Sequence, residues 1–152
     1  MKYWLVKSDT ADYSIDDFRK DKKTLWEGVR NYQARNFLVE MQIGDKVLFY
    51  QSVTEPIGVA GVGMVKKKAI ADPTQFDKKS KYYDSSASKE KPRWFCPELL
   101  FKKQFKTVIS LKSLRRRKRL NKMMLLKRGN RLSVMPVTEA EFLEIVGFEG
   151  CK

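Results

Sequence analysis

WEGVRNYQARN, residues 26–36, gathers two aromatic rings, two guanidinium groups and two asparagines around one glycine. Aromatic rings stack on nucleobases, asparagine offers a paired donor and acceptor to a base edge, and arginine offers a planar fork to a base or a phosphate. The same residues also suit a capped turn that leads into a helix. The stretch therefore indicates either a wall of a base-binding pocket or a helix entrance, and the rest of the sequence bears on the choice.

The positive charge of the chain is concentrated in its middle. The formal net charge is +14 over 152 residues, and residues 65–135 hold 22 Lys and Arg against five Asp and Glu, whereas residues 1–64 hold nine of each. A dense cationic surface attracts polyphosphate chains through a sequence-independent, salt-sensitive attraction. We therefore expect nucleic acid as the partner, although lysines that serve only solubility would give the same composition.

Length and composition predict a single domain over residues 1–152. No apolar stretch approaches the ~20 residues of a membrane span, and charge interrupts the N-terminus too early for a signal peptide. Cys96 and Cys151 lack the spacing of a metal site or a disulfide framework. We expect a soluble monomer without membrane association, in the bacterial cytosol or, in a eukaryote, the nucleus.

Apolar patterning predicts short strands that are separated by short helices. The strands are expected over 3–7, 46–51, 57–65, 94–105 and 131–137, and the helices over 14–20, 32–41, 110–124 and 138–146. Ser14 and Thr138 have the pattern of capping boxes, and Gly147 is expected to end the last helix. This irregular order predicts an α+β domain built on a curved sheet or small β-barrel.

Two further segments interrupt this pattern. Residues 66–93 are polar and are expected to form a long loop with one helical turn at 73–77. Pro97 lies inside an otherwise strand-like segment, which indicates an edge strand or a bulge. Residues 46–51 are apolar on both faces and are expected to form a central strand.

The sequence offers little for catalysis. It contains no histidine, so its serines lack the usual partner of a hydrolytic triad. The glycines of 58–63 do not follow the order of a dinucleotide fingerprint, and no Gly-Lys-Ser/Thr loop is present. We therefore expect a binding protein without a catalytic, cofactor or metal site.

Strand ends supply groups that suit recognition. Lys7 and Ser8 end the first strand, residues 50–52 end the second, and residues 131–133 open the last. These groups are expected to meet at one rim of the barrel, with residues 26–31 closing over it. A concave site with a ring for stacking and a few polar groups is what an extruded base requires. Trp26, Tyr50 and Trp94 also suit core positions, and for Trp94 the core position is favoured.

Arg115–Arg119 form an unbroken run of five bases. On a helix these side chains would point all round the axis, which favours a solvated surface over a nuclear-localisation signal. The side chains expected to bind phosphates are Arg35, Lys102, Lys103, Arg115, Arg116, Arg117, Lys118 and Arg119.

The motifs together resemble the EVE domain family along nearly the whole chain. They are Tyr3–Ser8, Tyr13–Asp17, Trp26–Asn36, Gly44-Asp45 with Phe49–Ser52, and Arg131–Val134 with Pro136-Val137. The resemblance implies a PUA-like fold, a small mixed β-barrel of five to six strands with flanking helices, related to the YTH and SRA readers. It also implies capture of a modified base, such as a 5-methylcytosine derivative in DNA or a modified base in RNA.

By position in the family, Lys7 and Ser8 would hydrogen-bond the base, and Trp26 would form the aromatic wall. The full predicted pocket is Lys7, Ser8, Trp26, Val29, Arg30, Asn31, Tyr50, Ser52, Arg131, Leu132 and Ser133. The chain departs from the family at Asp9-Thr10, where relatives have Glu-Pro, and at Glu27 and Gln51, where they commonly have Asp and His. Two alternatives stay open: an enzyme or accessory subunit that acts on modified nucleotides or tRNA, and a sensor of a nucleoside-like small molecule.

Overall fold

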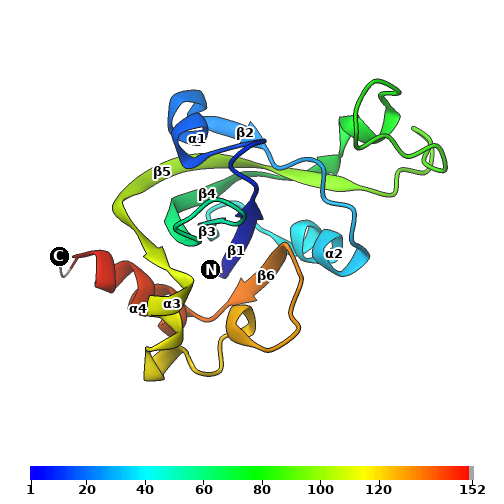
Figure 1. The fold of residues 1–152 in the computed structure, drawn as a ribbon. Helices are drawn as coiled ribbons and strands as arrows, with labels where there is room; N and C mark the ends of the chain where they lie inside the picture. The colour runs from blue at the N-terminus through cyan, green and yellow to red at the C-terminus, as the bar shows by residue number, and fades with distance from the viewer. Residues whose placement is uncertain (151–152) are drawn as a thin grey trace.

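The fold is built on a six-stranded mixed sheet. The computed structural model describes residues 1–150. The strands run in the order β2-β5-β4-β3-β1-β6 (Figure 1). They are β1 (Tyr3–Ser8), β2 (Lys23–Leu25), β3 (Lys46–Gln51), β4 (Gly58–Ala71), β5 (Phe95–Ser110) and β6 (Val134–Val137). The helices are α1 (Ile15–Asp21), α2 (Tyr32–Glu40), α3 (Leu111–Arg115) and α4 (Glu139–Gly150), with 3-10 turns η1 (Pro73–Phe76), η2 (Lys118–Leu120) and η3 (Met124–Leu126).

The strand pairing makes the sheet mixed. β1 is parallel to β3, and all other neighbouring strands are antiparallel. β3 lies between β4 and β1, so the predicted central strand is confirmed, and so is the α+β class. Of the helices in the described part of the chain, none has the length and apolar content that a membrane crossing requires.

Glycines allow β4 and β5 to curve closely around one another. A Cβ atom on Gly58 would lie 2.0 Å from the carbonyl oxygen of Ile109, and one on Gly61 would lie 2.4 Å from that of Lys103. The pairing of the two strands shifts register at four places. One shift, between Lys67 and Ile70, lies opposite Pro97, so the bulge expected there is confirmed.

The sheet separates two apolar clusters. Successive side chains of β1 alternate, so that Trp4 and Val6 join one cluster while Leu5 joins the other. The first cluster includes Trp26 and lies with α1 and α2, and the second lies with α3, α4 and the turns that precede β6. The two faces of each strand therefore lead to different environments.

The capping boxes at Ser14 and Thr138 are confirmed, as are α2 and η1. Five boundaries were wrong. β5 continues to Ser110, five residues past the expected end at residue 105. The expected helix over 110–124 is only α3, because the chain turns into η2 and η3 and buries Leu120 and Leu125 in the second cluster. β4 extends to Ala71, the final strand begins at Val134, and α4 continues past Gly147.

The β4–β5 connection is a projecting excursion that we call the arm, residues 72–94 (Figure 1). Its base is closed by the buried Gln75, whose amide nitrogen donates to the carbonyl oxygens of Asp72 and Trp94 at 2.8 and 2.9 Å. The amide oxygen of Gln75 accepts hydrogen bonds from the backbone N–H groups of Arg93 and Trp94. The two ends of the arm are therefore held together where it leaves and rejoins the sheet.

Candidate functional site

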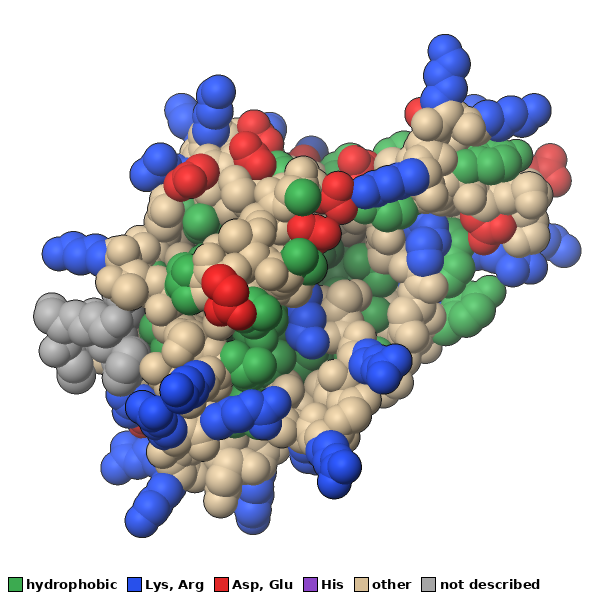
Figure 2. All heavy atoms as spheres, viewed as in Figure 1, with side chains coloured by type: hydrophobic (Ala, Val, Ile, Leu, Met, Phe, Trp, Pro, Cys, Tyr) green, Lys and Arg blue, Asp and Glu red, His purple; other side chains and the backbone are tan. Residues whose placement is uncertain are grey.

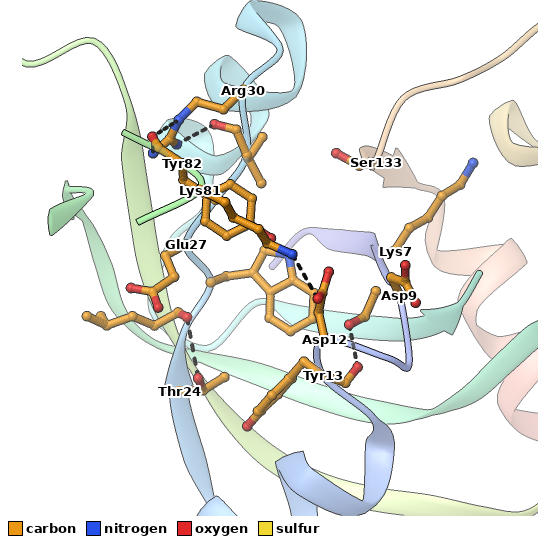
Figure 3. Close-up of a pocket in the computed structure, with 15 residues that line it drawn as sticks. Lys7, Asp9, Asp12, Tyr13, Thr24, Glu27, Arg30, Lys81, Tyr82 and Ser133 are labelled. Atoms are coloured by element: carbon orange, nitrogen blue, oxygen red, sulfur yellow. Dashed lines mark hydrogen bonds and ion pairs between the residues drawn. The ribbon is translucent and has the colours of Figure 1, made fainter. Parts of the chain in front are cut away.

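A pocket of about 460 Å³ opens beside the end of β1. Figure 3 shows Lys7 and Ser133 on one side of it and Glu27 and Tyr82 on the other. Its lining comes from the end of β1 and the loop after it, the segment from β2 to α2, the arm, and the residue before β6. The lining residues are Lys7, Ser8, Asp9, Asp12, Tyr13, Thr24, Leu25, Trp26, Glu27, Gly28, Val29, Arg30, Lys81, Tyr82 and Ser133.

Trp26 and Tyr13 give the pocket an aromatic wall. Their ring centroids lie 6.2 Å apart in an edge-to-face arrangement, and Trp26 also packs edge-to-face on Phe49 at 5.7 Å. Trp26 is only 7% exposed, and its backbone N–H donates to the carbonyl oxygen of Pro97 at 2.9 Å. The wall is thus both a surface of the pocket and a part of the first apolar cluster.

Lys7 brings a half-buried cation to the opposite side. Burial lowers the pKa of its ammonium, whose Nζ lies 5.6 Å from the centre of the Tyr50 ring. The backbone N–H of Lys7 donates to the carbonyl oxygen of Ser133 at 2.8 Å, which holds the segment before β6 against β1. The hydroxyl of Ser8 donates to the carbonyl oxygen of Tyr13 and thereby closes the loop after β1.

Arg30 fastens the pocket wall to the arm. Its guanidinium donates to the carbonyl oxygen of Tyr82 at 2.7 Å and 3.0 Å, to the Thr74 hydroxyl at 2.9 Å, and to the fully buried carboxylate of Asp72 at 3.1 Å. Asp72 also accepts the backbone N–H of Gly28 at 2.8 Å. The buried Asp72 carboxylate is thus the point at which the wall and the arm meet.

The pKa of Asp72 reflects these contacts. Burial disfavours the charged form and raises the pKa, but hydrogen bonds from Thr74, Gly28 and Arg30 together outweigh burial and hold the pKa below its ordinary value. Asp72 is therefore an ionised carboxylate at neutral pH, and its charge offsets that of Arg30.

Tyr82 packs directly against the backbone of Gly28. A Cβ atom on Gly28 would lie 2.7 Å from a carbon of the Tyr82 ring, and Gly28 has a φ of +87°, in the region that favours glycine. Lys81, which precedes Tyr82 in the arm, forms an ion pair with Asp12 at 2.8 Å. The arm therefore contributes one side of the pocket.

A family model for the EVE domain matches residues 2–148. This chain belongs to the EVE domain family. Thymocyte nuclear protein 1 of Gallus gallus is 37% identical over 166 residues, which span 97% of this chain and 68% of that protein.

Solved structures give the same assignment. A hypothetical protein from Leishmania major has a TM-score of 0.95 at 44% identity, covering 99% of this chain and 95% of its own. The crystal structure of the human THYN1 protein in complex with DNA containing 5-methylcytosine has a TM-score of 0.92 at 34% identity, covering 98% of each chain. The PUA-like fold expected for an EVE domain is confirmed.

The pocket of this EVE domain brings together six of the eleven residues predicted for it. They are Lys7, Ser8, Trp26, Val29, Arg30 and Ser133. Arg30, expected to offer its fork to a ligand, instead donates to the arm and to Asp72. Its place in the sequence predicted contact with a ligand. In the structure its hydrogen bonds instead hold the pocket wall against the arm.

Tyr50, Asn31 and Ser52 lie outside the lining, each for a local reason. The Tyr50 ring belongs to the second apolar cluster, because Phe49 takes the opposite face of β3 and packs on Trp26. The side chain of Asn31 caps α2 by accepting the Ala34 N–H at 2.9 Å. The Ser52 hydroxyl donates to the Ser8 carbonyl oxygen at 3.0 Å, so it stabilises the end of β1 and does not line the pocket.

Arg131 and Leu132 also lie outside the pocket lining. Arg131 is exposed outside the lining, while Leu132 packs against the apolar clusters and leaves Ser133 to face the pocket. Sequence reasoning missed nine lining residues: Asp9, Asp12, Tyr13, Thr24, Leu25, Glu27, Gly28, Lys81 and Tyr82. The position of Tyr13 just before a capping box was an available signal, whereas nothing in the sequence linked Tyr82 to Gly28.

The cations predicted to bind phosphates differ in their surroundings. Lys102, Lys103, Arg115, Arg116, Lys118 and Arg119 are exposed. Arg117 forms an ion pair with Glu144, and Arg119 lies 3.8 Å from the same carboxylate. Arg35 donates to the Arg93 carbonyl oxygen and covers the Tyr32 ring. Figure 2 shows basic side chains gathered over the region that holds α3 in Figure 1, and also on the arm.

Both cysteines were expected to be free of metal and disulfide. Cys96 is a buried free thiol, and burial raises its pKa to about 12. Cys151 lies outside the described residues.

Proposed function

We propose that this EVE domain binds nucleic acid and captures a modified base, such as 5-methylcytosine, in the pocket beside Trp26. The observation that carries the proposal is a pocket whose lining includes both a nearly buried aromatic wall and a half-buried lysine. Its volume of about 460 Å³ is within the usual range of about 300–1,000 Å³ for small-ligand sites. The complex of the human relative with 5-methylcytosine DNA supports the choice of ligand.

The chemistry of the lining suits a methylated pyrimidine. Trp26, Leu25 and Val29 offer apolar surface to a ring and its methyl group, and aromatic side chains are the usual stacking partners of extruded bases. The Lys7 ammonium can donate to a base oxygen or ring nitrogen, and the hydroxyl of Ser133 can donate or accept. Stacking and hydrogen bonding would therefore come from opposite sides of the pocket.

Affinity and selectivity would come from different parts of the domain. The exposed cations Arg115, Arg116 and Lys118 would attract the phosphate backbone without regard to sequence, whereas the pocket would recognise the base. Arg30 and Arg35 contribute less to this backbone attraction, because protein groups already accept their hydrogen bonds. We place the protein in the cytosol, or in the nucleus of a eukaryote.

Trp26→Phe tests the pocket. Alanine would be a poor choice, because truncating a buried tryptophan costs about 3–5 kcal/mol of stability. Phenylalanine keeps an aromatic ring but shortens the stacking surface, so we expect binding to a 5-methylcytosine duplex to weaken about tenfold. The salt dependence of binding should be unchanged. Fluorescence anisotropy with methylated and unmethylated duplexes measures both.

Trp94→Phe is the matched control. Trp94 is also buried but stacks on Tyr32 outside the pocket, at a centroid distance of 4.8 Å. The Trp94→Phe variant should keep the preference for the methylated duplex. If folded Trp26→Phe kept the full preference, the pocket assignment would be wrong, and a free nucleoside that bound as tightly as the duplex would indicate the small-molecule sensor.

A further inference from the structure

An exposed ion pair joins the two sides of the pocket mouth. Lys81 comes from the arm and Asp12 from the loop after β1, and both residues line the pocket. Their Nζ and Oδ1 atoms lie 2.8 Å apart, and the side chains are 60% and 47% exposed. Figure 3 shows the pair meeting between Glu27 and Lys7.

This pair differs from the other link between the arm and the pocket wall. Arg30 and Asp72 are held by several hydrogen bonds around a carboxylate that is fully buried. The ammonium of Lys81 instead meets Asp12 in solvent and lies 5.2 Å from the centre of the Tyr82 ring. Exposed pairs of this kind are weak and exchange partners readily.

A base that enters this pocket would bring its own anion to the mouth. The backbone phosphates of an extruded nucleotide stay attached to the strand outside the pocket, where Lys81 and Asp12 lie. A phosphate is an acceptor of the same kind as a carboxylate, so both compete for one ammonium. The hydrogen bond to Asp12 raises the pKa of Lys81, so this contact favours the charged form of the ammonium in the free protein.

On the basis of the proposed function, we propose that Lys81 binds a backbone phosphate of the nucleotide whose base enters the pocket, and that Asp12 holds this ammonium until the phosphate replaces it. Asp12 is thus an internal competitor of the nucleic acid. The arm keeps Lys81 at the mouth in both states, because Gln75 closes its base and Asp72 and Tyr82 hold it to Gly28 and Arg30 of the pocket wall. The exchange then requires rotation of side chains alone.

Two substitutions and their combination test the proposal. With a duplex that carries one 5-methylcytosine, Lys81→Gln should weaken binding roughly fivefold and reduce the salt slope by about one. Asp12→Asn should strengthen binding roughly two- to fivefold, because it frees the ammonium. Anisotropy titrations over a range of NaCl concentrations give both quantities.

The double variant separates competition from general electrostatics. If Asp12 acts by holding Lys81, the gain from Asp12→Asn must be larger when Lys81 is present than in the K81Q background. If it acts only by repelling the nucleic acid, the gain is the same in both backgrounds. Equal gains would therefore overturn the competition, as would weaker binding by Asp12→Asn.

Lys2 and Glu40 supply matched controls. Both are exposed and line a second hollow at the start of β1, and Lys2 lies five residues, or about 17 Å, along the strand from Lys7. Lys2→Gln and Glu40→Gln make the same changes of net charge far from the mouth, so we expect shifts in affinity below twofold.

The two proposals fail in different ways. A wild-type protein that binds no duplex contradicts the proposed function. A wild-type protein that prefers the methylated duplex, combined with unchanged affinity and salt slope in K81Q, contradicts only the role of Lys81.

Discussion

Segments 26–30 and 115–119 both carry arginines of the kind that bind nucleic acids, yet the fold uses them differently. In the first, Trp26 and Val29 are buried and Arg30 donates to the arm and to Asp72. In the second, four of the five side chains are exposed and Arg117 is paired with Glu144. An arginine whose N–H groups already donate to protein groups holds parts of the structure together, whereas an exposed arginine can donate to a ligand. The sequence motif alone does not distinguish the two.

The largest effect is expected where the first segment is held. Asp72→Asn keeps the size of the side chain but removes the charge that offsets Arg30. Removing one member of a largely buried pair leaves the other uncompensated, so we expect the free energy of unfolding to fall by about 3 kcal/mol. Chemical denaturation at neutral pH measures this loss.

Acid should remove the difference between Asp72→Asn and the wild type. The pKa of Asp72 in the folded state lies below its ordinary value of 3.8, so the ionised carboxylate contributes stability above that pH. As the pH falls through the folded pKa, the carboxylate is protonated and the contribution is lost. A difference in unfolding free energy that stayed constant into acid would show that the charge of Asp72 is not what holds the wall.

A smaller effect is expected from Gly28→Ala. The new Cβ atom would meet the Tyr82 ring at 2.7 Å, and the φ of +87° is strained for alanine. We expect a loss of about 1–3 kcal/mol in stability, together with weaker binding of the methylated duplex, because Tyr82 must leave the pocket wall.

Gly44→Ala isolates the contact from the strain. Gly44 has a φ of +94°, but nothing lies within 4 Å of the position of its Cβ atom. The Gly44→Ala variant should lose stability through backbone strain, and its binding of the methylated duplex should not change. Equal behaviour of the two variants in both assays would mean that the contact between Gly28 and Tyr82 does not shape the pocket.

The smallest effect on stability is expected in the second segment. The triple variant R115Q/R116Q/K118Q changes exposed side chains, so unfolding should shift by no more than about 0.5 kcal/mol. If these cations contact phosphates, the salt slope of binding should fall by up to about three.

The exposed lysines of β4 provide the control for this triple variant. K66Q/K67Q/K68Q removes the same charge from another surface. If both triple variants flattened the salt slope equally, the attraction would depend on total charge and would not be localised near α3.

The sequence was most informative where the determinants are local. Ser14 caps α1 through its own neighbours, and Asn31 caps α2 in the same way, so both helices could be predicted. β2 was missed, because three residues are too few to show an alternating pattern. The continuous apolar run of β3 gave no means to choose between Phe49 and Tyr50 for the face near Trp26.

The pocket depended on pairings that sequence patterns do not contain. Arg30 and Asp72 are 42 residues apart, and Lys81 and Asp12 are 69 apart. The arm was expected to be a polar loop, and its composition agrees with that expectation. Its role in the pocket arises because Gln75 and Asp72 direct the chain back over Gly28.

The hydrogen bonds of Gln75 at the base of the arm also affect which parts of the domain can change in length during evolution. The four hydrogen bonds of its side-chain amide join the two ends of the arm, so the sheet does not depend on the length of chain between them. Doubling a flexible loop costs only about 0.6 kcal/mol. Insertions and deletions in residues 85–92 should therefore accumulate in evolution more freely than elsewhere, varying the reach and charge of the arm while β4, β5 and the pocket wall are preserved.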